Sequence, residues 1–104
     1  VFQPHLYSRT AAHGEAMGRA LAAADLAVVT DIYAAREQPM PGVSGHDVAS
    51  AAEAAGVATV YEPDRRVLGR RVLESVEPGD LVLTLGAGDV TRVGPELLAA
   101  LRAG

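Results

Sequence analysis

Leu26-Ala27-Val28-Val29-Thr30 is the stretch of this chain that decides its fold. The run is short and apolar, which is typical of a parallel β-strand that helices cover on both faces. A helical pattern precedes it over Thr10–Ala24, where apolar side chains recur at i, i+3, i+4 and i+7. The predicted inner face of that helix consists of Met17, Ala20, Leu21 and Ala24. A helix packed against a buried strand is therefore expected at the start of the fold.

The same alternation continues along the rest of the chain. Ser44 and Asp47 form a predicted capping box for a helix that Gly56 closes, and Asp64 caps a further helix to about Val76. The remaining predicted elements are the strands Ala58–Tyr61 and Leu81–Leu85, and a last helix with Pro95 at its first position and Leu97, Leu98 and Leu101 turned inward. This order predicts right-handed crossovers and an α/β fold: a Rossmann-like three-layer sandwich with a mostly parallel sheet and helices on both faces.

The composition excludes several classes of partner. The chain has 104 residues, enough for one domain, with a formal net charge of -4 and no lysine among its nine basic residues. A phosphate-backbone footprint needs clustered basic side chains, so nucleic acid is not an expected partner. Cysteine is absent, and no apolar run approaches the roughly 18 residues of a membrane span. We expect a cytoplasmic protein without membrane contact.

The chain opens abruptly. Val1 and Phe2 are too few for a stable first strand, and they lead at once into a polar turn. We therefore interpret residues 1–104 as part of a domain whose first strand and helix lie upstream. Open parallel sheets present the carboxyl ends of their strands to one ligand crevice, so the polar turns after the strands should lie together. These turns are residues 4–9, 30–33, 62–63 and 86–89.

Arg9 is the strongest candidate for ligand binding at this edge, because its planar guanidinium can hold a carboxylate or a phosphate through two parallel hydrogen bonds. A surface arginine that caps nearby carbonyls is the alternative. His5 follows a stiff proline turn that aims its ring at the same edge, and a structural histidine would explain it as well. Tyr7 could donate to a bound anion, whereas Ser8 or Thr10 could cap the helix instead.

Two further pairs of residues belong to the same crevice. Asp31 and Tyr33 open the longest irregular stretch, which is too long for a simple connection. Asp31 could orient a substrate amine or a ribose, or it could serve a turn or a helix start. Gly86 and Gly88 follow a strand and are similar to the beginning of a dinucleotide fingerprint whose third glycine is missing here; a tight strand-to-helix turn explains them equally well. No spacing of histidines and carboxylates indicates a metal site, and no residue is assigned a catalytic role.

Three segments resemble one known family, the Mur ligases. Phe2–Thr10 is similar to the FQPHRYSRT segment in the C-terminal domain of the L-alanine-adding members. Asp31–Pro39 looks like their DVYAAGEAP segment, and Asp80–Val90 is similar to their GDLVLTQGAGNV segment. The segments occur in the same order and spacing and cover nearly the whole chain. Their upstream DDYAHHP-type segment has no counterpart here.

The resemblance implies a three-domain ligase of peptidoglycan biosynthesis, and hence of cell shape and division. It would use ATP and Mg²⁺ to activate the carboxylate of UDP-N-acetylmuramate as an acyl phosphate, which the amine of L-alanine then attacks. The central and N-terminal domains would hold ATP, Mg²⁺ and the UDP-sugar, so this segment would be inactive alone. Arg9 would bind the L-alanine carboxylate, with His5 beside it. Leu6 stands where the family motif has its first arginine, so one arginine of that pair is carried over.

Two other classes of function fit parts of the sequence. The two glycines after the strand Leu81–Leu85 suggest a freestanding Rossmann-like nucleotide-binding module without catalysis. An interaction domain without a ligand is the third reading. Titration of the segment with ATP or NAD separates these hypotheses, because tight binding favours the freestanding module.

Overall fold

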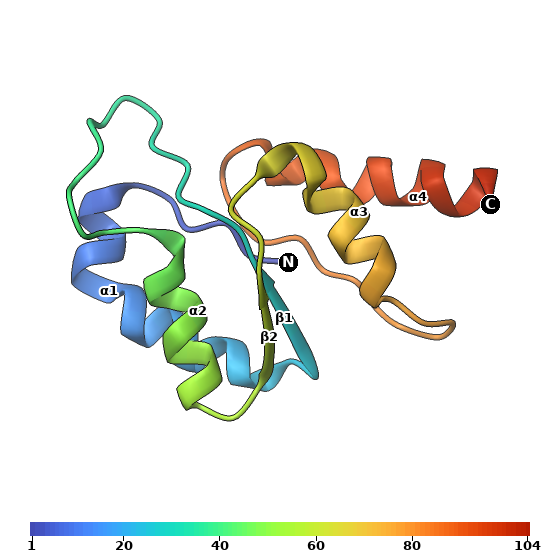
Figure 1. Cartoon of the computed structure of the whole chain (residues 1–104), viewed down its shortest axis with the longest axis horizontal. Coiled ribbons are helices and arrows are strands. Elements are labelled where there is room, and N and C mark those ends of the chain that lie inside the picture. The colour runs from blue at the N-terminus through green and yellow to red at the C-terminus, as the bar shows by residue number, and fades with distance from the viewer.

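A computed structural model describes the chain from residue 1 to residue 104 (Figure 1). Along the chain, helices alternate with the strands of a small parallel sheet, which confirms the predicted α/β class. The elements are α1 (Tyr7–Ala20), the 3₁₀ turn η1 (Leu21–Ala23), β1 (Leu26–Val29), α2 (Gly45–Ala54), β2 (Ala58–Tyr61), α3 (Arg65–Ser75), the 3₁₀ turn η2 (Asp89–Arg92) and α4 (Val93–Ala103).

The two regular strands of the sheet are β1 and β2. They pair in parallel, with Val29 opposite Tyr61. The first residues of the chain extend it, because Phe2 forms parallel bridges with Val29 on one side and with Leu85 on the other. The Phe2 N–H donates to the Val28 carbonyl at 2.8 Å, and the Leu85 N–H donates to the Val1 carbonyl at 2.8 Å. The order across the sheet is therefore β2, β1, the opening residues and the segment that ends at Leu85.

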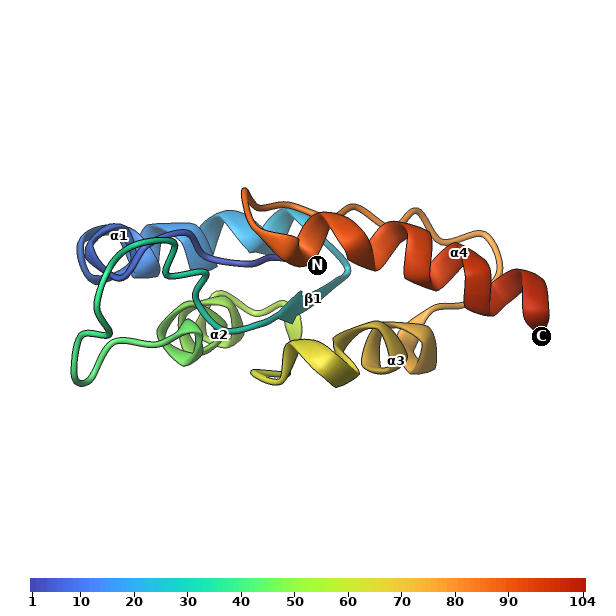
Figure 2. The ribbon, with the colours of Figure 1, turned by 90° about the horizontal axis from the view of Figure 1, so that it is seen from above.

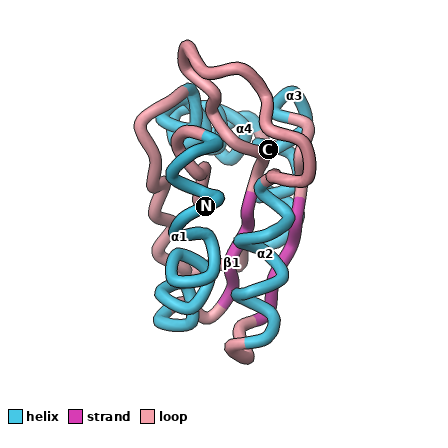
Figure 3. Tube along the Cα trace, turned by 90° about the vertical axis from the view of Figure 1, so that its left-hand side faces the viewer, coloured by secondary structure: helices cyan, strands magenta, loops and turns pink.

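Helices cover both faces of this sheet, as predicted. Figures 1 and 3 show α1 and α2 on one face and α3 and α4 on the other, and Figure 2 shows α1 and α4 in one row with α2 and α3 in the second. The side chains of β1 alternate between the layers. Val28 packs in a buried cluster with residues of α3 and α4, whereas Ala27 and Val29 pack in clusters with residues of α2.

The local signals of the sequence for α2 and α3 are confirmed. Ser44 and Asp47 form a reciprocal capping box at the start of α2, with the Ser44 N–H donating to Asp47 Oδ2 at 3.1 Å. Gly56 follows the end of α2 with a φ of 97°, a conformation that glycine adopts without steric cost. The Arg66 N–H donates to Asp64 Oδ1 at 2.9 Å at the start of α3.

The predicted start of the first helix is wrong. The helix begins at Tyr7 rather than Thr10, and its N-cap is Leu6, so neither Ser8 nor Thr10 has that role. The Leu6 N–H donates to the carbonyl of Tyr33 at 3.0 Å, and this tertiary bond fixes the turn before the helix. Thr10 Oγ1 instead donates back to the Leu6 carbonyl at 2.9 Å within the first turn.

The predicted inner face of that helix is also wrong in part. Met17 and Leu21 are half-buried, but Ala20 and Ala24 are exposed. The fully buried residues of α1 are Thr10, Gly14 and Gly18. The physical reason is close contact with α2: a Cβ on Gly18 would lie 2.5 Å from the Val48 carbonyl oxygen. Small residues therefore form the contact stripe where larger side chains were expected.

Leu81–Leu85 is extended but is not a regular strand, contrary to prediction. It has a neighbour on one side only, over the short length of Val1–Gln3. Leu81 and Leu83 are 84% and 57% exposed. Because a ladder needs a partner of matching length, the run of apolar residues alone does not make a strand here.

The last helix also departs from prediction. It begins at Val93, directly after η2, so Pro95 lies within its first turn instead of at its first position. Val93 and Leu97 are buried, whereas Leu98 and Leu101 are about half exposed. One narrow stripe is sufficient because α4 packs mainly on α3. No helix of the chain is both long enough and apolar enough to cross a membrane.

Candidate functional site

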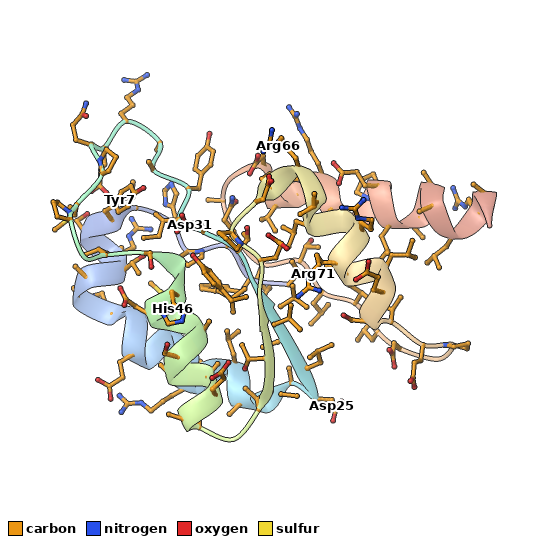
Figure 4. All side chains as sticks on the ribbon, viewed as in Figure 1. Tyr7, Asp25, Asp31, His46, Arg66 and Arg71 are labelled. Carbon is orange, nitrogen blue, oxygen red and sulfur yellow. The ribbon has the colours of Figure 1, made fainter.

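The turn after the opening residues and the turn after β1 lie side by side at one end of the sheet. The Tyr33 N–H donates to the Pro4 carbonyl at 2.9 Å, and the Tyr33 carbonyl accepts from the Leu6 N–H at 3.0 Å. These bonds continue the parallel pairing beyond the strands, with His5 opposite Tyr33. Figure 4 shows Tyr7 and Asp31 at this end of the molecule and Asp25 at the opposite end. The structure thus brings the first two of the predicted polar strand ends, residues 4–9 and 30–33, side by side.

His5, Tyr33 and Arg9 form a polar cluster at this edge, in which Arg9 and Tyr33 are exposed and His5 is half-buried. The rings of His5 and Tyr33 are stacked, with centroids 6.0 Å apart and planes 19° from parallel. Arg9 Nη1 lies 3.4 Å from His5 Nδ1. Arg9 is exposed and forms no ion pair with any carboxylate of the chain, unlike Arg19, whose guanidinium pairs with Glu15. Its guanidinium is available for the carboxylate or phosphate of a ligand.

Glu37 is a residue of this edge that sequence reasoning did not single out. Its carboxylate accepts hydrogen bonds from the Ser8 N–H, at 3.1 Å, and from the Ser8 hydroxyl. The hydroxyl bond lowers the pKa of Glu37, with smaller contributions from the backbone N–H groups of Ser8 and Tyr7 and from the charge of His5. The contact joins residues 29 positions apart, so no local pattern could have indicated it.

Asp31 has a structural role in the structure. Its Oδ1 accepts from the Ile32 N–H at 2.8 Å and from the Gly45 N–H at 2.9 Å, so it holds the start of α2. This is the helix-start alternative that the sequence left open. Tyr7 occupies the first position of α1 and is half-buried, one residue before the Ser8 contact.

Gly86 and Gly88 lie against other parts of the chain. Gln3 is 5% exposed; its Nε2 donates to Asp89 Oδ1 at 2.9 Å, and its Oε1 accepts from the Val90 N–H at 3.3 Å. A Cβ on Gly88 would overlap the ring of Tyr33 and lie 2.7 Å from Gln3 Oε1, and a Cβ on Gly86 would lie 3.0 Å from the Gln3 carbonyl oxygen. The side chains of the protein itself therefore fill the space beside this turn.

Arg65 joins the same turn to the helices behind it. Its Nη2 donates to the carbonyl of Asp89 at 3.0 Å and lies 3.2 Å from Glu96 Oε1. Its Nε lies 3.5 Å from Asp89 Oδ2. The side chain of Arg65 is only 22% exposed, so these pairs are partly shielded from solvent. Arg65 thus serves the scaffold, in contrast to the exposed and unpaired Arg9.

No group of three or more histidine, cysteine or carboxylate side chains is placed to hold a metal ion. A groove of about 350 Å³ lies away from the polar edge, lined almost wholly by apolar side chains. Val1, Leu26, Val28, Leu81 and Leu83 are among its lining residues. The groove and the polar cluster are separate features, because Leu26 is the first residue of β1 and Tyr33 follows its other end.

Comparison with known proteins adds an independent finding. Residues 1–88 match the family described as Mur ligase, glutamate ligase domain. Over 103 residues the chain is 55% identical to the UDP-N-acetylmuramate–L-alanine ligase of Mycobacterium sp. strain JLS, covering 99% of this chain and 21% of that protein. Proteins with the same description from Mycolicibacterium paratuberculosis and Mycobacterium tuberculosis are 55% identical over 102 residues, covering 98% of this chain and 20% of each protein. The chain spans about a fifth of the length of the curated relatives it matches.

Proposed function

The chain belongs to the Mur ligase family, within its glutamate ligase domain, and from that premise we propose that it is the C-terminal domain of a ligase joining L-alanine to UDP-N-acetylmuramate. The proposal is supported by relatives of that description at 55% identity over almost the whole chain. The reaction is a cytoplasmic step of peptidoglycan biosynthesis, in which ATP activates the muramate carboxylate and the amine of L-alanine displaces the phosphate.

Arg9 binds the carboxylate of L-alanine in this proposal, with His5 beside it. The observation that supports this is the exposed guanidinium of Arg9, which has no carboxylate partner and lies 3.4 Å from the His5 ring at the polar edge. A bidentate pair between arginine and a carboxylate gives both affinity and orientation. Tyr7 and Tyr33 border that pair in the proposal, and Gly88 lies against the ring of Tyr33.

ATP and Mg²⁺ do not fit the residues of this chain. There is no lysine for a P-loop, no metal-binding cluster, and the space beside Gly86 and Gly88 is filled by Gln3 and Tyr33. We assign both to the central and N-terminal domains of the ligase, which also hold the UDP-sugar. The part of the reaction that belongs to this domain is the binding and orientation of the amino acid.

The apolar groove supports the place of this chain within a longer domain. The Val29 carbonyl accepts a hydrogen bond from the Glu62 N–H, just after β2. Because successive residues of a strand direct their backbone groups to opposite sides, the N–H of Val28 faces the opening residues. The Leu83 N–H makes no backbone hydrogen bond. Hydrogen bonds in a parallel ladder repeat every second residue, so carbonyls placed before Val1 would meet both N–H groups. These observations support a strand that is longer in the proposed ligase than in this chain and that lies between Leu26–Val28 and Leu81–Leu83.

Kinetics of the full-length ligase that carries this domain test the role of Arg9. In Arg9→Ala, we expect the KM for L-alanine to rise about ten- to a hundredfold, because a charge-assisted bidentate contact is lost. The KM values for ATP and UDP-N-acetylmuramate should stay near wild type. Arg70→Ala is the matched control, since Arg70 is exposed on α3 and forms no ion pair.

Two outcomes would contradict the proposal. An unchanged KM for L-alanine in Arg9→Ala would remove Arg9 from the amino-acid site. Tight binding of ATP or NAD to the isolated chain, measured by calorimetry, would favour the freestanding nucleotide-binding module instead of a ligase domain.

A further inference from the structure

The helix that carries Arg9 has no N-terminal cap of its own. Leu6 occupies the N-cap position with a φ of 69°, and its apolar side chain makes no capping hydrogen bond. The first turn of α1 also contains no acidic residue. The first N–H groups of a helix have no partner within the helix and need one from elsewhere. The start of α1 therefore depends on the loop that follows β1.

Glu37 supplies that missing cap from the loop. One carboxylate oxygen accepts from the Ser8 N–H at 3.1 Å, and the other accepts from the Ser8 hydroxyl. The negative charge also compensates the positive end of the helix dipole. The loop thus contacts the start of α1 at two places. The Glu37 carboxylate bonds to Ser8, and the backbone of Tyr33 bonds to the backbone of Pro4 and Leu6.

Arg9 lies in the first turn of α1, next to the contacts that Glu37 and Tyr33 make with the start of this helix. It follows Ser8 in the first turn, and its guanidinium reaches back to His5, which stacks on Tyr33. A first turn that frays would let both side chains lose this common orientation. The pairing of Ser8 with Glu37 is the side-chain contact that ties this turn to the loop.

We propose that Glu37 is a positioning residue for L-alanine: it fixes the first turn of α1 so that Arg9 faces the amino-acid carboxylate. This inference rests on the proposed function. Glu37 has a second effect at the same place, because its charge occupies the positive end of α1. An incoming carboxylate is therefore directed to Arg9 and not to the free N–H groups of the helix.

Steady-state kinetics of the full-length ligase test the inference. In Glu37→Ala, we expect the KM for L-alanine to rise about five- to tenfold. An effect of this size corresponds to the free energy that is lost when a helix cap is removed. The kcat and the KM values for the other two substrates should change less than about twofold, which a general loss of folded enzyme would not produce. Ser8→Ala should shift the KM in the same direction. Glu15→Ala is the matched control, because Glu15 is an exposed, ion-paired glutamate of the same helix.

A double-mutant cycle separates this inference from the proposed function. If Glu37 acts through Arg9, adding Glu37→Ala to Arg9→Ala should raise the KM for L-alanine by less than about twofold. Multiplicative effects of the two substitutions would overturn the positioning role while leaving Arg9 in the site. An unchanged KM in Arg9→Ala alone would instead overturn the proposed function.

A second variant keeps the test valid should Glu37→Ala fail to fold. Glu37→Gln retains one oxygen that accepts from Ser8, replaces the second acceptor by an amide NH₂ group and loses the charge. A KM for L-alanine between those of wild type and Ser8→Ala is expected. A wild-type KM in both Glu37→Gln and Ser8→Ala would overturn the inference.

Discussion

The ring of Tyr33 lies directly on the backbone of Gly88, so close that a Cβ on Gly88 would overlap the ring carbons Cγ and Cδ2. This contact joins the turn after β1 to the turn after Leu85. It also explains Gly88 without a nucleotide, because glycine is needed where another side chain approaches the backbone. The same ring of Tyr33 stacks on His5, so Tyr33 links the turn of Gly88 to the candidate amino-acid site.

Replacing Gly88 by alanine should therefore disturb the site. The added methyl group would overlap both the ring of Tyr33 and Gln3 Oε1, and such overpacking costs about 1–3 kcal/mol. We expect lower stability in urea denaturation and a higher KM for L-alanine in the full-length ligase. Gly94→Ala is the control, since nothing lies within 4 Å of a Cβ there. Equal behaviour of the two variants would show that the Tyr33 contact is unimportant.

Gly18 and Gly14 provide a matched pair on α1. A Cβ on Gly18 would lie 2.5 Å from the Val48 carbonyl oxygen and 2.8 Å from Ala52 N, which are backbone atoms of α2. Gly18→Ala should therefore lower the free energy of unfolding by about 1–3 kcal/mol or more. At Gly14 the nearest atom is at 3.5 Å, so alanine should be tolerated and raise stability by up to about 1 kcal/mol through helix propensity. Urea denaturation that ranks the two variants in the opposite order would contradict this packing.

Asp31 should behave as a scaffold residue and not as a ligand-binding one. Asp31→Ala removes the acceptor for the Ile32 and Gly45 N–H groups and should cost about 1–2 kcal/mol of stability. Asp31→Asn keeps a side-chain oxygen and should cost less. In both variants, the KM for L-alanine at a temperature where the protein is folded should match wild type. A selective rise of that KM in Asp31→Asn would assign Asp31 to the site.

The contact between Glu37 and Ser8 should weaken in acid. The pKa of Glu37 is lowered from its ordinary value of 4.5, chiefly because the Ser8 hydroxyl donates to the charged form. A lowered carboxyl pKa contributes stability above the ordinary pKa, and this contribution is lost as the pH falls through the lowered value. An NMR titration of the glutamate carboxyl carbons should show Glu37 titrating below 4.5 in wild type and closer to 4.5 in Ser8→Ala. Identical titration curves for Glu37 in the two proteins would rule out this cause.

Amide exchange in the full-length ligase should detect the continued strand. The Val28 and Leu83 N–H groups should exchange with deuterium much more slowly than that of Gly79, which lies in an exposed turn. Carbonyls of the residues before Val1 would provide this protection. Rapid exchange at both positions would show that no strand fills the space between Leu26 and Leu81.

Much of the fold could be predicted because its signals are local. The capping box of Ser44 with Asp47, the Asp64 cap and Gly56 each act within one helix turn, and all three were confirmed. Leu81–Leu85 failed as a regular strand because pairing depends on a partner that is distant in sequence. The inner face of α1 failed because close helix packing selects glycine, which an apolar period does not count.

The candidate site divides in the same way. Polar turns at strand ends pointed to Arg9, His5 and Tyr33, and the structure brings these three residues together. Glu37 and Gln3 were missed as parts of this edge, because their partners Ser8 and Asp89 are 29 and 86 positions away. The binding roles of Arg9 and His5 stay predictions.

The sequence by itself determined the α/β class, the caps of α2 and α3 and the family, because periodicity, capping and motif order are written within short stretches of chain. Only the tertiary structure decided what holds the arginine of that motif in place. The carboxylate on the first turn of α1 comes from Glu37, and the ring beside His5 comes from Tyr33. Both lie on a loop whose position depends on the packing of the sheet. Contacts of this kind follow from how the layers close in space, which no local pattern of residues records.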